Sequence, residues 1–97
     1  MHFELKEDEK WVVIHFEGEG IILPEELRTI SPPDLVKLKL SHKGVVLSGR
    51  GPVWLYSFLT HFYHPAAFIA TFDTHLNKAV VTSSHVSGFS EGDILEL

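Results

Sequence analysis

The chain has 97 residues, which is the length of a single domain, residues 1–97. Its formal net charge is −5. This charge argues against a protein that coats long DNA or RNA, because a basic surface supplies most of the affinity for such ligands. The absence of cysteine excludes disulfides, thiolate catalysis and thiolate-bound zinc.

Two further features concern localisation and assembly. Residues 1–10 are charged, which predicts that they are no signal peptide, and no run of about 20 apolar residues occurs. We therefore expect a cytoplasmic protein with no membrane partner. Hydrophobic residues make up 44% of the chain, whereas a monomer of this size buries only about 60–65% of its surface. This excess of apolar residues favours a homo-oligomer.

The first half of the chain predicts two strands and one helix. Residues 2–6 alternate weakly, and residues 11–17 (WVVIHFE) are β-branched and aromatic, so we expect a pair of strands. Pro24 followed by two glutamates predicts a helix start. The proline pair at 32–33 keeps that helix short. Residues 34–40 are ambiguous between a strand and an irregular connection.

The second half predicts a helix between buried strands. Residues 45–47 form a short apolar run between glycines, typical of a strand buried on both faces. Pro52 suits the first turn of a helix that ends at or before His64, and its apolar side chains predict cover on most sides. Further strand-like runs are residues 67–72, 79–82 and 94–97. The pattern predicts an α/β domain with a mixed sheet of about five or six strands and two helices.

A glycine-flanked arginine joins the 45–47 strand to this helix. In such a junction backbone N–H groups and the helix N-terminus can approach an anion, and Arg50 can add a bidentate contact to a phosphate. The alternative interpretation is a tight turn that needs glycine for its backbone angles, with Arg50 in solvent. The candidate anion-binding residues are Ser48, Gly49, Arg50 and Gly51.

Histidines form the second candidate site. His61 and His64 are three residues apart at the end of the predicted helix, Asp73 and His75 follow the next strand, and His85 follows the strand after that. If these ends converge, a cluster of histidines and a carboxylate suits manganese, zinc or iron. Taken one at a time, each histidine is more often structural, for example at a helix C-terminus. We place His2, His15 and His42 in that structural class.

The remaining polar and aromatic side chains have simpler interpretations. The aromatic residues of the predicted helix can stack on adenines, but at helical spacing they are more often core or dimer interface; they are Trp54, Tyr56, Phe58, Phe62 and Tyr63. The acidic residues near the N-terminus are interpreted as solvated loop and strand-edge residues; they are Glu7, Asp8, Glu9, Glu17 and Glu19.

Several stretches together resemble a known family. They read GVVLSGRGPVWLYSFLTHFYHP, AFIATFD, KAVVTSSH and EGDILEL, and they cover residues 43–97. This half resembles the small manganese-dependent CRISPR-associated ring nucleases of type III systems. The N-terminal half agrees more loosely, through IHFE, ILPEEL and the paired prolines. The resemblance implies one ring-nuclease-like domain, distantly related to the Rossmann-like sensors of cyclic oligoadenylates. It also implies a homodimer, or a higher oligomer around the ligand.

The resemblance further implies binding and cleavage of cyclic tetra-adenylate with Mn2+. Its catalytic residues correspond to His64 (or His61) and Asp73, and His85 would lie near the metal with them. The turn of Ser48, Gly49, Arg50 and Gly51 would hold phosphates. The family commonly reads Asp-Pro-Arg where this chain has Asp73-Thr74-His75, so His75 stands in place of an arginine that would contact phosphate.

Two other functions remain open at this stage. One is a manganese-dependent 3′-exonuclease acting on RNA tails, which the acidic charge disfavours. The other is a non-catalytic module that binds cyclic oligoadenylate.

Overall fold

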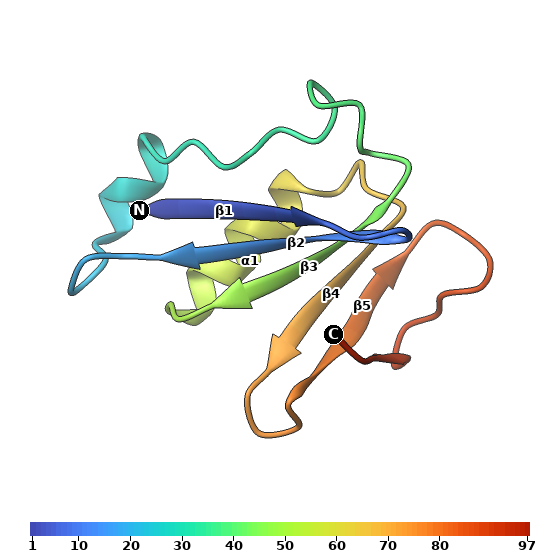
Figure 1. Ribbon diagram of the computed structural model, residues 1–97. Helices are drawn as coiled ribbons and strands as arrows, with labels where there is room; N and C mark the ends of the chain where they lie inside the picture. Colours follow the sequence, from blue (N-terminus) through green and yellow to red (C-terminus); the bar gives the residue numbers. More distant parts are fainter.

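The computed structural model describes all 97 residues and contains one six-stranded mixed sheet (Figure 1). The strands are β1 (His2–Glu7), β2 (Trp11–Glu17), β3 (Gly44–Gly49), β4 (Phe68–Asp73), β5 (Lys78–Ser84) and β6 (Ile94–Leu95). They lie in the sheet in sequence order. Neighbours β2 and β3 are parallel, as are β3 and β4, and the other pairs are antiparallel. The predicted mixed sheet is therefore confirmed.

Strand β2 forms because its side chains alternate between two environments. Val12, Ile14 and Phe16 are fully buried, whereas His15 and Glu17 lie on the opposite face. Strand β3 is buried on both faces over residues 44–47, as its continuous apolar run predicts. The parallel strands β2, β3 and β4 have their carboxyl ends at one edge of the sheet.

The helical content is lower than predicted. There is one α-helix, α1 (Val53–Phe62), and the predicted helix at Pro24 is a 3-10 helix, η1 (Pro24–Arg28). The Glu26 carboxylate accepts the N–H of Leu23 at 2.7 Å and so closes a single turn. The proline pair at 32–33 follows soon after and cannot continue a helix. Residues 35–39 form turns, and the stretch 34–40 contains no strand.

Both crossovers between the parallel strands contribute to one core. Leu55 and Leu59 of α1 and Leu35 of the β2–β3 connection pack in the same buried cluster as Val12 and Leu47 of the sheet. Figure 1 shows α1 lying behind β2 and β3. Most positions of α1 are buried or half-buried, as its apolar sequence predicts, but Val53, Ser57 and His61 are exposed along one stripe, Val53 to 83%. A single copy therefore leaves one face of this apolar helix open.

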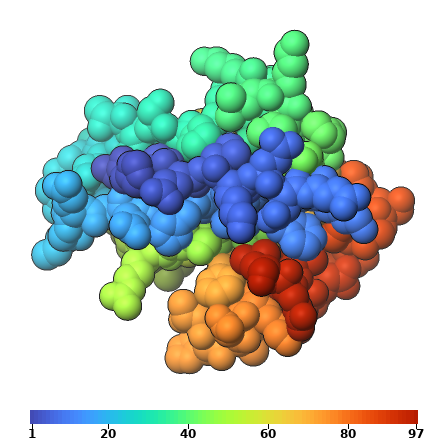
Figure 2. All heavy atoms as spheres, in the orientation of Figure 1, coloured from blue at the N-terminus to red at the C-terminus, as the bar shows by residue number.

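The C-terminal residues run back toward the first hairpin. Figure 2 shows them beside the β1–β2 hairpin and the β4–β5 hairpin. Leu95 is buried in a second cluster with Val46, Phe68 and Val81, on the sheet face opposite α1. No helix in the chain has the length and apolar character needed to cross a membrane.

Tyr63 is expected to make the stability of the fold decrease at alkaline pH. Its hydroxyl donates to the Pro33 carbonyl oxygen at 2.8 Å, and burial, followed by the nearby Asp34 charge, raises its pKa. The unfolded tyrosine ionises near pH 10, so the unfolded state loses a proton that the folded state keeps. This contribution is present below about pH 10 and is lost as the pH rises further. We expect Tyr63→Phe to lower the free energy of unfolding by about 1 kcal/mol at neutral pH. The variant should also show a smaller decline of this free energy at alkaline pH.

Urea unfolding followed between pH 7 and about pH 11 tests this expectation. Tyr56→Phe is the comparison variant, since it leaves the Tyr63–Pro33 hydrogen bond in place. Burial also raises the Tyr56 pKa, so we expect this variant to flatten the alkaline decline in stability too, but less than Tyr63→Phe does. A Tyr63→Phe protein that keeps the full alkaline decline would show that another group titrates.

Candidate functional site

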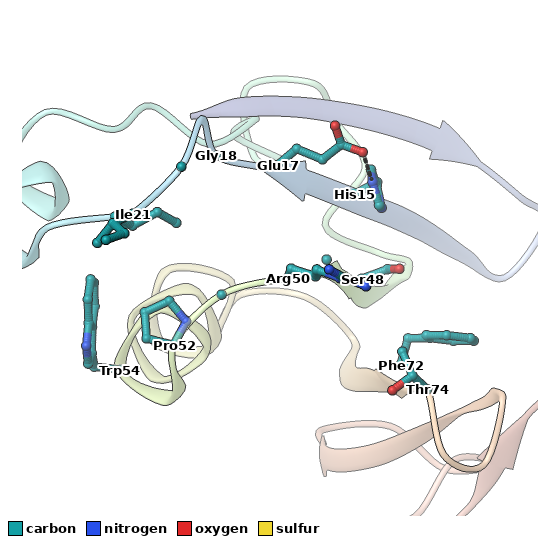
Figure 3. Close-up of a pocket in the computed structure, with 14 residues that line it drawn as sticks. His15, Glu17, Gly18, Ile21, Ser48, Arg50, Pro52, Trp54, Phe72 and Thr74 are labelled. Atoms are coloured by element: carbon teal, nitrogen blue, oxygen red, sulfur yellow. Dashed lines mark hydrogen bonds and ion pairs between the residues drawn. The ribbon is translucent and has the colours of Figure 1, made fainter.

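The largest pocket lies at the edge where β2, β3 and β4 end (Figure 3). Its volume is about 840 Å³, within the range of small-molecule sites. In open sheets with parallel strands, ligands bind outside the carboxyl ends of those strands. The pocket is lined by His15, Glu17, Gly18, Gly20, Ile21, Ile22, Ser48, Gly49, Arg50, Gly51, Pro52, Trp54, Phe72 and Thr74.

The centre of this pocket is the turn of residues 48–52, called here the 48–52 turn. Gly49 is needed because a Cβ atom there would lie 2.3 Å from the Phe16 carbonyl oxygen. The Tyr56 hydroxyl donates to the Gly49 carbonyl oxygen and fixes the turn from the first half of α1. Burial raises the Tyr56 pKa, so this phenol remains a donor at neutral pH. The turn is thus held in one conformation by the sheet and by the helix.

Electrostatically, the 48–52 turn suits an anion. Arg50 is exposed and is the only lysine or arginine among the lining residues. The turn leads directly into α1, whose first amide groups and positive dipole end favour negative charge. The four predicted anion-binding residues, Ser48 to Gly51, therefore lie together in one pocket; ligand binding by them stays a prediction.

A histidine–glutamate pair lies beside this turn. His15 Nε2 and Glu17 Oε1 are 3.0 Å apart (Figure 3), and His15 is the register partner of Ser48 across β2 and β3. Sequence reasoning assigned both side chains to structural or solvated roles. The signal that identifies them is the period-two alternation of β2, which sets them on the face opposite Val12, Ile14 and Phe16.

The pocket also has apolar walls. Ile21, Pro52 and Trp54 line one end, and Phe72 and Thr74 line the other, with Arg50 and Ser48 between them (Figure 3). Sequence reasoning favoured a core or interface role for Trp54, but this side chain is half-buried and lines the pocket. An indole beside a cation and a helix N-terminus offers a stacking surface for a base next to a phosphate position.

Three of the predicted histidines meet at the opposite end of the molecule. The His61 and His64 rings stack, with centroids 5.7 Å apart, and His64 Nδ1 donates to the His61 carbonyl oxygen at 3.1 Å. His85 Nε2 donates to the His64 carbonyl oxygen at 3.2 Å. All three residues are exposed. The end of α1 thus brings these three histidines near one another through contacts to backbone carbonyls, and their catalytic or metal-binding role stays a prediction.

Asp73 does not join these histidines. It ends β4, which begins near them at Phe68 and rises about 3.3 Å per residue, so roughly 16 Å of strand separates the two ends. Nowhere in the chain do three or more histidine, aspartate or glutamate side chains form a metal site. The predicted His/His/Asp/His convergence is wrong within one chain, because β4 carries Asp73 away from the end of α1. The residues of one copy therefore do not fit the expected manganese site.

Asp73 and His75 have visible local roles instead. Asp73 Oδ1 accepts the backbone N–H groups of His75 at 2.7 Å and of Leu76 at 3.4 Å, and so closes the β4–β5 turn. His75 is exposed and does not line the pocket, whereas Thr74 does. Phosphate contact by His75 stays a prediction.

Comparison with known proteins identifies the family of this chain. A family model described as CRISPR-associated protein (Cas_csx3) matches residues 15–96, a range that contains the 48–52 turn, α1 and β4. The chain is 50% identical over 84 residues to an uncharacterized protein of Aquifex aeolicus (strain VF5), covering 87% of this chain and 76% of that protein. Since the family model spans most of the sheet and the whole pocket, this chain belongs to the Csx3 family of CRISPR-associated proteins.

Proposed function

We propose that this protein binds cyclic tetra-adenylate and cleaves its phosphodiester bonds to give short linear oligoadenylates, which switches off a type III CRISPR response. The pocket at the 48–52 turn is the main support, because it offers a cation, a helix N-terminus and a stacking surface together. Family membership supports a role in CRISPR defence. The resemblance over residues 43–97 supports ring cleavage.

The 48–52 turn binds the phosphates in this proposal. A ring of adenylates carries one negative charge per phosphate, whereas the protein has a net charge of −5. Local donors must therefore overcome long-range repulsion. Arg50 supplies a fixed positive charge with paired donors, and the glycines allow the backbone amides to approach. The Tyr56 contact to Gly49 keeps these donors in place before the ligand arrives.

The reaction is assigned to His64, with His61 beside it, and to Asp73 on a different copy. One chain holds these groups at opposite ends of β4, so the proposed active site needs a homodimer or a higher oligomer. His64 and His85 of one copy with Asp73 of another would give the mixed nitrogen and oxygen ligands that suit Mn2+. The open face of α1 supports association, since Val53 and His61 on that face are exposed.

A second candidate is a module that binds the ring without cutting it. The separation of Asp73 from the histidines and the absence of a metal cluster in one copy favour this candidate. The pocket suits either function, because both functions require a bound phosphate and the donors of the 48–52 turn can hold one.

Incubation of purified protein with an excess of cyclic tetra-adenylate separates the two candidates. We expect many rings to be converted to linear products per protein when Mn2+ is present, no conversion with excess EDTA, and recovery when Mn2+ is restored. Binding without product under all conditions would establish the non-catalytic module. Turnover unchanged by EDTA would remove the metal from the proposal. Linear RNA with a 3′ tail, tested in parallel, shows whether the same protein trims RNA ends.

A further inference from the structure

Glu17 is the only acidic side chain that lines the pocket. His15 Nε2 holds its Oε1 at 3.0 Å, and no hydrogen bond in the chain engages Oε2. His2 lies opposite Glu17 in β1, but its ring nitrogen contacts Glu4 instead, at 3.2 Å. One oxygen of Glu17 is therefore free, on a side chain that a neighbour already orients.

This free carboxylate oxygen lies near the phosphate-binding turn. Phe16 of β2 is the register partner of Gly49 of β3. Glu17 is the last residue of β2, and Arg50 directly follows the last residue of β3, so the two residues lie at the same level of the sheet edge. Figure 3 shows Glu17 and His15 above Arg50 and Ser48, away from the apolar end at Trp54. A ligand whose phosphate contacts Arg50 presents to Glu17 the groups adjacent to that phosphate.

The chemistry of a carboxylate restricts what it can contact there. An ionised carboxylate only accepts hydrogen bonds, so it repels a phosphate and binds a donor. Within an internal adenylate the donors are the ribose 2′-hydroxyl and the N6 amino group. The 2′-hydroxyl is next to the 3′-phosphate, whereas N6 is at the far end of the base. In nucleotide-binding folds an acidic residue binds the ribose 2′-hydroxyl beside a glycine-rich turn that leads into a helix.

Structural stabilisation does not account for the pair. The side chains of His15 and Glu17 are 41% and 70% exposed, and exposed ion pairs contribute little to stability. The fold therefore does not depend on Glu17, and a variant without its carboxylate is expected to fold.

We propose that Glu17, oriented by His15, accepts a hydrogen bond from the 2′-hydroxyl of the nucleotide whose phosphate contacts Arg50. The pocket then distinguishes ribonucleotides from analogues that lack this donor. This inference rests on the proposed function, because it requires an adenylate in the pocket.

Binding of two linear tetra-adenylates tests the role of Glu17. One carries 2′-hydroxyl groups and the other 2′-fluoro groups, which cannot donate a hydrogen bond. Fluorescence anisotropy is measured in EDTA, so that no metal-dependent cleavage occurs. We expect the wild-type protein to prefer the hydroxyl tetramer at least about tenfold, since a hydrogen bond to a charged group is lost in the analogue. Glu17→Ala should reduce this preference to about twofold or less, because it removes the charged acceptor.

Glu19→Ala is the matched control. It removes one negative charge two residues after Glu17, in the connection that follows β2, but Glu19 does not line the pocket. The loss of a negative charge should by itself make both variants bind either anionic tetramer more tightly. Only the ratio of the dissociation constants for the two tetramers therefore reports the hydroxyl contact. We expect Glu19→Ala to keep the wild-type ratio, and a folding check by urea unfolding accompanies each variant.

The outcomes separate this inference from the function on which it rests. The inference is wrong if wild type shows no preference, if Glu17→Ala keeps it, or if Glu19→Ala loses it equally. Arg50→Ala should weaken the binding of both tetramers. If Arg50→Ala binds both as tightly as wild type, the pocket is not the ligand site, and the inference on Glu17 fails together with the assignment of phosphate binding to the 48–52 turn. If Arg50→Ala weakens binding while Glu17→Ala keeps the preference, only the inference on Glu17 fails.

Discussion

Replacement of Asp73 by Asn is expected to lower the turnover of cyclic tetra-adenylate by at least about 100-fold, which is the scale of a lost acid–base group. Asn keeps the size of the side chain and an oxygen that accepts the N–H groups of His75 and Leu76, so the β4–β5 turn should remain. Only the negative charge is removed. Single-turnover and steady-state rates with Mn2+ measure the effect, and ring binding in EDTA should be nearly unchanged.

The chain offers a close control for this variant. Asp34 Oδ1 accepts the N–H groups of Val36 and Lys37, two and three residues ahead, in the same pattern as Asp73. Asp34→Asn therefore makes the same chemical change in an equivalent turn outside the pocket. If both variants lose turnover equally, the effect is structural. If Asp73→Asn retains turnover close to that of wild type, Asp73 has no part in the reaction.

Replacement of Arg50 is expected to have the second large effect, which is on ligand binding and not on the cleavage step. Arg50→Ala should weaken the binding of cyclic tetra-adenylate by roughly 1.5–3 kcal/mol, the range for hydrogen bonds to charged groups. This corresponds to about 10- to 150-fold in Kd. The physical reason is that Arg50 is the one full positive charge among the lining residues, while the helix dipole and the amides supply only partial charge. A titration of labelled ring in EDTA measures the change.

Arg28→Ala controls for the loss of a positive charge. Arg28 is the only other arginine, it ends η1, and it does not line the pocket. The two variants have the same net charge, so the difference between them reports the local contact. Equal affinity for wild type and Arg50→Ala would mean that the 48–52 turn is only a turn and that the ring binds elsewhere.

Much of the fold could be predicted from local patterns. The alternation of Trp11–Glu17, the short apolar run before Gly49 and the prolines around α1 each depend on residues close together in the sequence. The glycine-flanked arginine was also visible, and the structure places it in the main pocket. The type of helix at Pro24 was not predicted, because a single turn of 3-10 helix and a short α-helix begin with the same residues.

The tertiary structure alone decided which strand ends meet. Parallel pairing of β2 and β3 sets His15 opposite Ser48, and so adds His15 and Glu17 to the pocket. The direction of β4 separates Asp73 from His64, although only eight residues lie between them in the sequence. Local patterns determine strands and turns, because neighbouring residues set backbone angles and burial. Strand order, direction and register depend on pairing between distant segments, and these determine which of the site residues lie together.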